Sequence, residues 1–281
     1  MDSTLFRIPF GSWVEAGLEW IITSFGGFFA VLRSIFLAFF DGVSWLLTAP
    51  PFWVVILVLC AIAFFARSWK LAAGSALGFL VIYGVGQWEN AMASLALVLV
   101  ASAVAIAVSV PLGILTARSG AASATVKPIL DFMQTMPAFV YLIPALLLFR
   151  VGVVPGIVAT IIFAMAPGVR FTELGIRGVD REVVEAGHAF GASPGKILTR
   201  IQLPLATPTI MAGINQVIML SLSMVVIAGM VGAGGLGGDV VKSLSRIDAA
   251  LGFEAGISVV ILAIFLDRVT ASLGRRSAPA A

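Results

Sequence analysis

The sequence is poor in charge and almost empty of the side chains that build metal and thiol chemistry. Only 11% of its 281 residues are Asp, Glu, Lys or Arg, against about 25% in soluble domains. A single cysteine, Cys60, excludes intrachain disulfides and cysteine-based metal sites. A single histidine, His188, excludes a histidine cluster for a metal and argues against a Ser-His hydrolase.

Apolar residues take the place of the missing charges. They make up 60% of the chain, and the mean hydropathy is +1.10, which excludes a water-soluble domain. Several runs approach the roughly 20 apolar residues that cross a bilayer as a helix. The composition therefore predicts an all-α polytopic membrane protein. The apolar runs place about seven transmembrane helices at approximately 51–66, 71–87, 94–117, 129–149, 156–176, 208–232 and 252–273.

The N-terminal segment 17–49 is also apolar, but it contains Arg33 near its middle and Asp41 near its end. Both charges are costly at the centre of a bilayer. An amphipathic helix at the membrane interface is therefore favoured over an eighth span. The chain divides into an N-terminal extracytoplasmic or interfacial segment, peripheral transmembrane helices, a core transmembrane domain and a cytoplasmic tail. These parts cover residues 1–50, 51–93, 94–273 and 274–281.

The distribution of Lys and Arg predicts the orientation. If the C-terminus is cytoplasmic, 12 of the 17 basic residues lie inside and 5 outside. Cytoplasmic loops carry an excess of Lys and Arg, so the N-terminus is expected outside and the C-terminus inside. This orientation places the longest polar segment, 177–207, in the cytoplasm.

Segment 177–207 has the densest charge in the chain and predicts two short helices. The first covers about 181–190 and stops at Gly191, a residue suited to the left-handed turn after a helix. Ser193 and Pro194 are typical of the start of a second helix, about 194–202, which would end before Pro204. A two-faced hairpin of this kind indicates a docking surface for a cytoplasmic partner. An ordinary solvated loop is the alternative.

The hairpin also carries a specific motif, EAA---G---------I-LP, with Gly where the third position is usually Ala. Its matching residues are Glu185, Ala186, Gly187, Gly191, Ile201, Leu203 and Pro204. On these residues the chain resembles the permeases of binding-protein-dependent ABC importers. The resemblance implies a type I ABC importer transmembrane domain, in which this loop forms the coupling helices that sit in a groove of the ATPase subunit.

Segments 130–149, 204–237 and 252–270 further resemble the glycine betaine, proline betaine and choline permeases of osmoprotection importers. This resemblance implies a homodimer with two cytoplasmic ABC ATPases and an extracytoplasmic substrate-binding protein, which would dock on outer loops such as 150–155 and 233–251. ATP and Mg would be bound by the ATPase. This chain is expected to be non-catalytic, to bind no cofactor, metal or nucleic acid, and to lie in the bacterial inner membrane.

Two glycine-rich stretches imitate nucleotide motifs. GAGGLG at 232–237 lacks the strand-turn-helix unit of a dinucleotide site and is interpreted as a flexible outer turn. GASPGK at 191–196 is one residue short of a phosphate loop and lacks its final Ser or Thr. His188 is interpreted as a surface residue, and Asp131 and Glu173 as anchors at the membrane interface.

Two spans carry polar and flexible side chains at mid-membrane depth. The residues concerned are Gln134, Thr135, Pro137, Tyr141, Asn215, Gln216, Met219, Ser221, Ser223 and Met224. Lipid cannot satisfy the polar groups, so they are expected to face a water-filled translocation path. Hydrogen bonding between helices is the alternative for each. The prolines permit kinks near a gate.

The favoured function is the transmembrane permease subunit of an ABC importer for glycine betaine, choline or a related quaternary amine. A stand-alone secondary carrier or channel for small zwitterions is the second hypothesis. An intramembrane enzyme is the third, and no catalytic constellation supports it. The sequence leaves open the preferred amine, any osmotic regulation, and whether this chain has a substrate site of its own.

Overall fold

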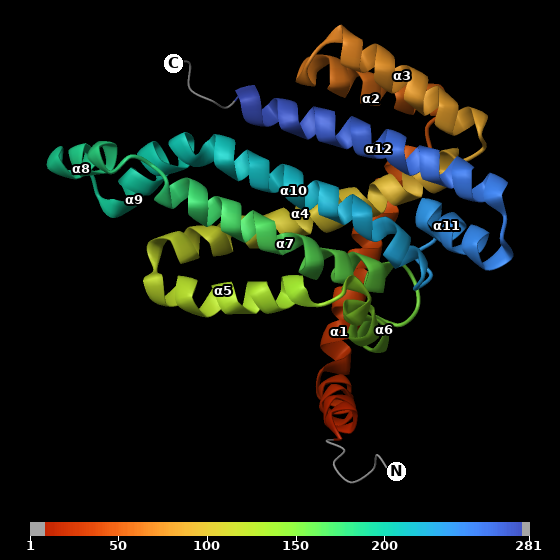
Figure 1. Ribbon diagram of the computed structural model, residues 1–281, viewed down its shortest axis with the longest axis horizontal. Helices are drawn as coiled ribbons and strands as arrows, with labels where there is room; N and C mark the ends of the chain where they lie inside the picture. The colour runs from red at the N-terminus through yellow and green to blue at the C-terminus, as the bar shows by residue number, and fades with distance from the viewer. Residues whose placement is uncertain (1–8, 277–281) are drawn as a thin grey trace, which may run out of the picture.

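Four long helices form the centre of the bundle: α4 (Trp88–Arg118), α7 (Val153–Arg177), α10 (Leu203–Gly229) and α12 (Ala249–Arg276). The computed structural model describes residues 9–276, and no strand occurs among them. The four helices run along a shared direction (Figure 1) and coincide with four of the seven expected spans. Of the expected tail, residues 277–281 lie outside the described part, as do residues 1–8 of the N-terminal segment.

The two spans expected at 51–66 and 71–87 are the helices α2 (Phe52–Ala66) and α3 (Trp69–Gly84). They form a hairpin beside α12 at the edge of the bundle (Figure 1). With 15 and 16 residues, each is shorter than the roughly 20 residues of a full crossing. Five other helices are long and apolar enough to cross a membrane, namely α1, α4, α7, α12 and the continuous helix 194–229.

The apolar run 129–149 is not one straight span. Helix α5 (Gly120–Thr135) is followed by a 3₁₀ turn (Ala138–Tyr141) and by α6 (Leu142–Phe149), with a bend of 106°. Pro137 explains the break, because proline forces the preceding residue out of the helical region, and Met136 is extended (ψ 136°). The Tyr141 hydroxyl donates to the Met133 carbonyl across the bend. The sequence allowed for a kink here, but not for one of this size.

Helix α1 (Phe10–Thr48) has 39 residues and kinks at Phe25. It satisfies the length and hydropathy of a span, yet it runs across the shared direction of α7, α10 and α12 (Figure 1). Arg33 donates from Nε to the Phe149 carbonyl at 3.0 Å, where the end of α6 attracts a cation. The Arg33 guanidinium therefore has a hydrogen-bond acceptor within the protein. The interfacial placement of this segment stays a prediction.

Glycines let α7 pack closely between α4 and α10. A Cβ added at Gly113 of α4 would lie 2.5 Å from the Thr172 Cβ, and one at Gly213 of α10 would lie 2.5 Å from the Phe171 Cβ. Such distances require the helices to move apart. The three helices α4, α7 and α10 therefore form one closely packed block.

The GAGGLG stretch forms a sharp turn and a helix crossing. Gly232 and Gly234 have φ values of +85° and +71°, a conformation that favours glycine. At Gly237, in α11 (Gly235–Arg246), an added Cβ would lie 2.0 Å from the Val225 carbonyl oxygen of α10. The glycines are thus needed where the backbones of α10 and α11 meet.

Candidate coupling hairpin and translocation path

The predicted hairpin is present and projects from one end of the bundle, where α8 and α9 extend beyond the other helices (Figure 1). Helix α8 spans Arg181–Ala189, and Asp180 caps it by accepting the Glu182 N–H at 2.9 Å. Helix α9 spans Pro194–Ile197 and begins with proline at its first position. Both starting points follow from ordinary capping preferences.

The turn between the helices depends on Gly191, which has a φ of +75°. The Ala192 N–H donates to the Gly187 carbonyl at 3.1 Å, and the Gly191 N–H donates to the His188 carbonyl at 2.9 Å. This pair of hydrogen bonds is the Schellman ending of a helix. The expected helix stop at Gly191 is confirmed, and His188 is exposed as expected.

The spacing of the motif brings Gly187 and Ile201 together across the hairpin. A Cβ at Gly187 would lie 2.7 Å from the Ile201 Cδ1, and Ile197 beside them is only 3% exposed. Glu185 and Ala186 are exposed instead, and Glu185 pairs with Arg181 at 2.8 Å. The hairpin therefore has a packed inner face and a polar outer face.

The second helix does not end before Pro204, so that prediction is wrong. Residues Leu198–Gln202 form a π-helical stretch that leads without a break into α10. Proline in a regular helix clashes with the carbonyl four residues earlier, and the wider π turn accommodates the ring. Leu203 packs beside Ile176 of α7, whereas Pro204 is exposed.

The tip of the hairpin carries a large apolar side chain that no part of the described chain covers. Phe190 is 92% exposed, and Val183 on α8 is also exposed. These two apolar side chains, on a structured element that projects from the bundle, are accessible to a partner.

The candidate path residues separate into two groups. Gln134, Thr135, Pro137, Gln216 and Ser223 are exposed and Met219 is partly exposed, whereas Tyr141, Ser221 and Met224 are buried. The exposed members lie at the end of α5 and on one face of α10. Their role as a path lining stays a prediction.

The buried members, and Asn215, which is partly buried, make contacts within the chain. Tyr141 and Met224 belong to one apolar cluster between the α5–α6 bend and α10. Asn215 donates to Asp267 Oδ1 at 3.2 Å and accepts from the Thr270 hydroxyl, both on α12. Asn215 thus makes the helix–helix contact that was the alternative to path lining.

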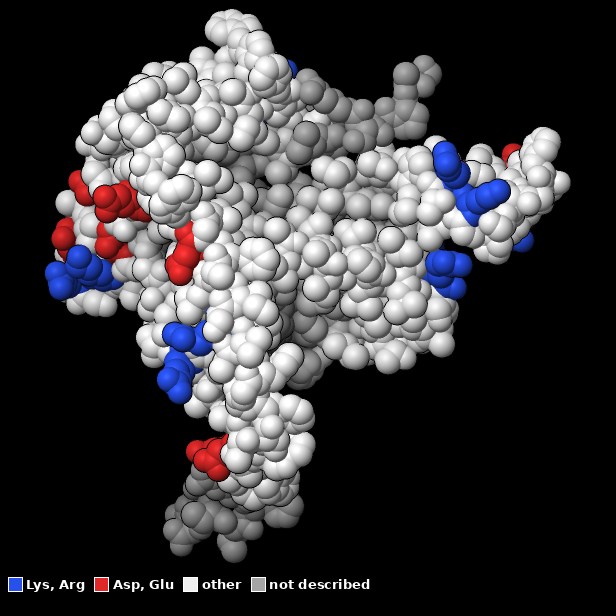
Figure 2. Space-filling view, turned by 180° about the vertical axis from the view of Figure 1, so that it is seen from behind, with Lys and Arg blue, Asp and Glu red and all other residues white. Residues whose placement is uncertain are grey.

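Charged side chains gather at the two ends of the bundle. In Figure 2 the end that carries the hairpin shows mainly basic side chains, whereas the opposite end shows a cluster of acidic side chains with basic ones beside it. At that opposite end the Gln87 and Asn90 amides donate to Asp239 Oδ2 at 3.1 and 2.8 Å. The sequence does not predict this link between α4 and α11, because 149 residues separate Asn90 from Asp239.

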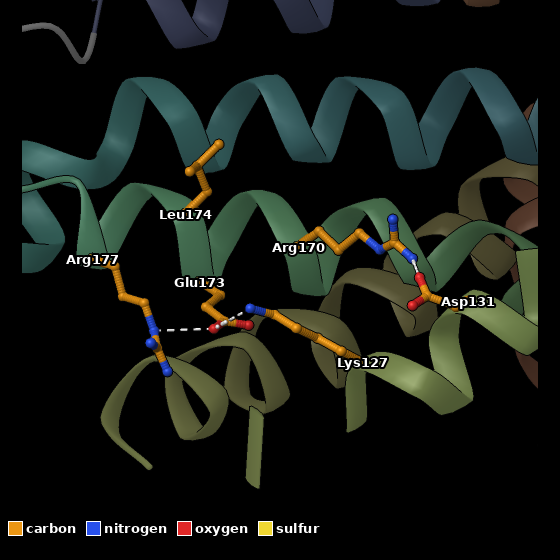
Figure 3. Close-up of a pocket in the computed structure, with 6 residues that line it drawn as sticks. All are labelled: Lys127, Asp131, Arg170, Glu173, Leu174 and Arg177. Atoms are coloured by element: carbon orange, nitrogen blue, oxygen red, sulfur yellow. Dashed lines mark hydrogen bonds and ion pairs between the residues drawn. The ribbon is translucent and has the colours of Figure 1, made fainter. Parts of the chain in front are cut away.

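The anchor Glu173 lies one turn before the hairpin end of α7, and Asp131 lies one turn before the C-terminal end of α5; both are paired between helices. Asp131 pairs with Arg170, and Glu173 pairs with Lys127 and Arg177 at 3.0 Å each (Figure 3). These side chains line a cavity of about 350 Å³. The sequence identified the two carboxylates but not their partners.

A bundle of apolar helices long enough to cross a membrane, with a capped hairpin projecting from one end, is the architecture of a multi-pass membrane protein. The chain belongs to the family of binding-protein-dependent transport system inner membrane components, whose sequence pattern matches residues 109–279. It is a multi-pass permease subunit of an ABC importer. This finding favours the importer over the stand-alone carrier or channel that was the second hypothesis.

Individual relatives cover most of the chain. It is 46% identical over 270 residues to the glycine betaine/proline betaine transport system permease protein ProW of Escherichia coli, covering 96% of this chain and 76% of ProW. It is 46% identical over 274 residues to the glycine betaine/carnitine transport permease protein GbuB of Listeria monocytogenes, covering 96% and 97%. An inward-facing structure of the methionine ABC transporter MetNI matches with a TM-score of 0.61 at 21% identity, covering 66% of this chain and 92% of that chain. That match supports the type I importer fold.

Proposed function

We propose that two copies of this chain form the transmembrane unit of an importer for glycine betaine or a related quaternary amine. Two cytoplasmic ABC ATPases would bind ATP and Mg and drive the cycle, and an extracytoplasmic binding protein would deliver the substrate. The N-terminus lies outside and the C-terminus inside, which places the hairpin on the ATPase side.

The geometry of the hairpin is the observation that carries this proposal. Its turn is fixed by Gly191, its tip exposes Phe190, and its second helix continues into α10. An ATPase that grips the tip therefore pushes on a rigid lever whose far end carries the candidate path residues. Such a lever suits a switch between inward- and outward-facing states by rigid-body movement.

The exposed polar face of α10 supports a path between two copies. Gln216 and Ser223 lie seven residues apart and are both exposed, so they share a helix face. An uncharged lining of this kind would let a zwitterion pass without holding it tightly. Glycine betaine is the substrate that the names of both ProW and GbuB share.

Reconstitution tests the proposal. The chain is purified with its ATPase and binding protein, inserted into liposomes, and supplied with labelled glycine betaine, proline betaine, carnitine or choline. We expect uptake that requires both ATP and the binding protein. Uptake driven by an ion gradient without the partners would contradict the proposal.

Two matched phenylalanine variants test the hairpin itself. Phe190→Ala should weaken ATPase binding, measured by titrating the ATPase onto the permease in nanodiscs. Phe253→Ala removes a phenylalanine that is 81% exposed on α12 and should leave ATPase binding unchanged. Equal binding by both variants would exclude the hairpin tip from the ATPase interface.

A further inference from the structure

The charged seam between α5 and α7 is a feature that the proposed function does not use (Figure 3). It consists of Ser123, Lys127 and Asp131 on α5 and Arg170, Glu173 and Arg177 on α7. Residues three or four apart share a helix face, so the seam is a row of contacts along two facing stripes.

Glu173 is the centre of the seam and is only 3% exposed. Its Oε1 accepts a hydrogen bond from Ser123 at 2.8 Å and lies 3.0 Å from Lys127 Nζ and from Arg177 Nε. A buried carboxylate is costly unless it is paired. The contacts with Ser123 and Lys127 join α7 to α5, whereas the pair with Arg177 lies within α7.

Helix α5 depends on the seam more than its neighbours do. Within α5, whose residues are all described, only Ser123 and Leu130 are buried. Leu130 packs beside Ala166 and Val169 of α7. By contrast, α4 and α10 approach α7 so closely that glycines are required. Helix α5 is therefore held against the packed block of α4, α7 and α10 by few apolar contacts and mainly by the seam.

The seam also reaches the hairpin. Arg177 lies in the last turn of α7, three positions before Asp180, which caps α8. Its guanidinium additionally donates to the Thr116 carbonyl of α4 at 2.8 Å. A movement of the hairpin therefore acts on Arg177 first and on Glu173 next. At its C-terminal end, α5 carries Gln134 and Thr135, which shortly precede the break at Pro137.

We propose that the charged seam transmits hairpin movement to α5, so that Glu173, Asp131 and Arg170 are positioning residues for the inner part of the path. The proposal rests on the proposed function and adds how ATPase movement reaches the path. Its signature is a loss of coupling, in which ATP is still hydrolysed but less substrate moves for each ATP.

The Asp131–Arg170 pair gives the sharpest test because both side chains are partly exposed (63% and 41%) and tolerate substitution. Asp131→Asn, Arg170→Gln, Arg170→Lys and the double variant Asp131→Asn/Arg170→Gln are reconstituted with the ATPase and binding protein. Glu173→Gln reports on the centre, and Glu15→Gln on exposed α1 is the matched control. Uptake of labelled glycine betaine and ATP hydrolysis are measured in the same liposomes.

We expect each neutral single variant to lower uptake per ATP by about fivefold, with ATP hydrolysis within about twofold of the unmodified complex. Arg170→Lys keeps the charge and should retain most of the coupling. The double variant should lose no more than either single, since the two residues act through one contact. Glu173→Gln should lose more than either, and Glu15→Gln nothing.

Unchanged uptake per ATP in both single variants would overturn the proposal, as would losses that multiply in the double variant. A parallel loss of uptake and hydrolysis would also overturn it, since that result describes damage to the fold or to ATPase docking. Failure of the proposed function is distinguishable, because the unmodified complex would then show no ATP-dependent uptake.

Discussion

Replacing Gly191 by alanine tests whether the shape of the hairpin matters for ATPase docking. The residue has a φ of +75°, and an added Cβ would meet no atom within 4 Å. The substitution therefore creates no clash, and its cost is the left-handed backbone alone, about 1–2 kcal/mol. A cost of this size lowers the ratio of native to non-native turn by about 5- to 30-fold. We expect ATPase binding to weaken by up to the same factor.

Gly195→Ala is the matched control, four residues further on. Gly195 lies in α9, has no positive φ, and also has open space around an added Cβ. Alanine is better than glycine in a helix by about 1 kcal/mol, so ATPase binding should be unchanged or slightly tighter. Both variants are compared by titrating the ATPase onto the permease in nanodiscs. Equal dissociation constants would refute the argument that the left-handed turn presents the docking surface.

Three further predictions concern the packing of the bundle. Gly113→Ala should destabilise the protein by about 1–3 kcal/mol because it overpacks the α4–α7 contact, whereas Gly74→Ala, with open space around it, should leave the thermal unfolding midpoint unchanged or raise it. Asn215→Ala should lower that midpoint because it removes the hydrogen bonds that join α10 to Asp267 and Thr270 of α12. Gln216→Ala should keep the midpoint and alter the uptake rate. The reverse pattern would exchange their assigned roles. Asp239→Ala should cost about 1–3 kcal/mol, since it removes the acceptor of the buried Gln87 amide at the start of α4. A midpoint equal to that of the unmodified protein would exclude this link from the stability of the end opposite the hairpin.

Local chemistry was enough to predict the hairpin and most of the helices. Hydropathy located the helices because the bilayer sets their length, and Gly191 predicted the helix stop because few other residues adopt its φ. The helix end predicted before Pro204 was wrong, because a π turn accommodates the proline ring and α10 begins without a break.

The contacts between distant segments could not be predicted. Asp131 and Arg170 are 39 residues apart, and Asn215 and Asp267 are 52 apart. Hydropathy and turn chemistry locate each helix but do not say which of its faces meets which neighbour. The bend of 106° at Pro137 is a partial case, because proline indicates a kink but not its angle.

The side of the membrane on which the hairpin lies is the central claim, and one labelling measurement tests it. Cys60 is the only cysteine, so Ser193→Cys in a Cys60→Ser background gives a single reporter at an exposed position whose side chain caps nothing. The reporter is treated with a membrane-impermeant maleimide in intact cells and in inside-out vesicles. The account predicts labelling in the vesicles alone, and protection there when the ATPase is added. Labelling in intact cells would place the hairpin outside and contradict the account.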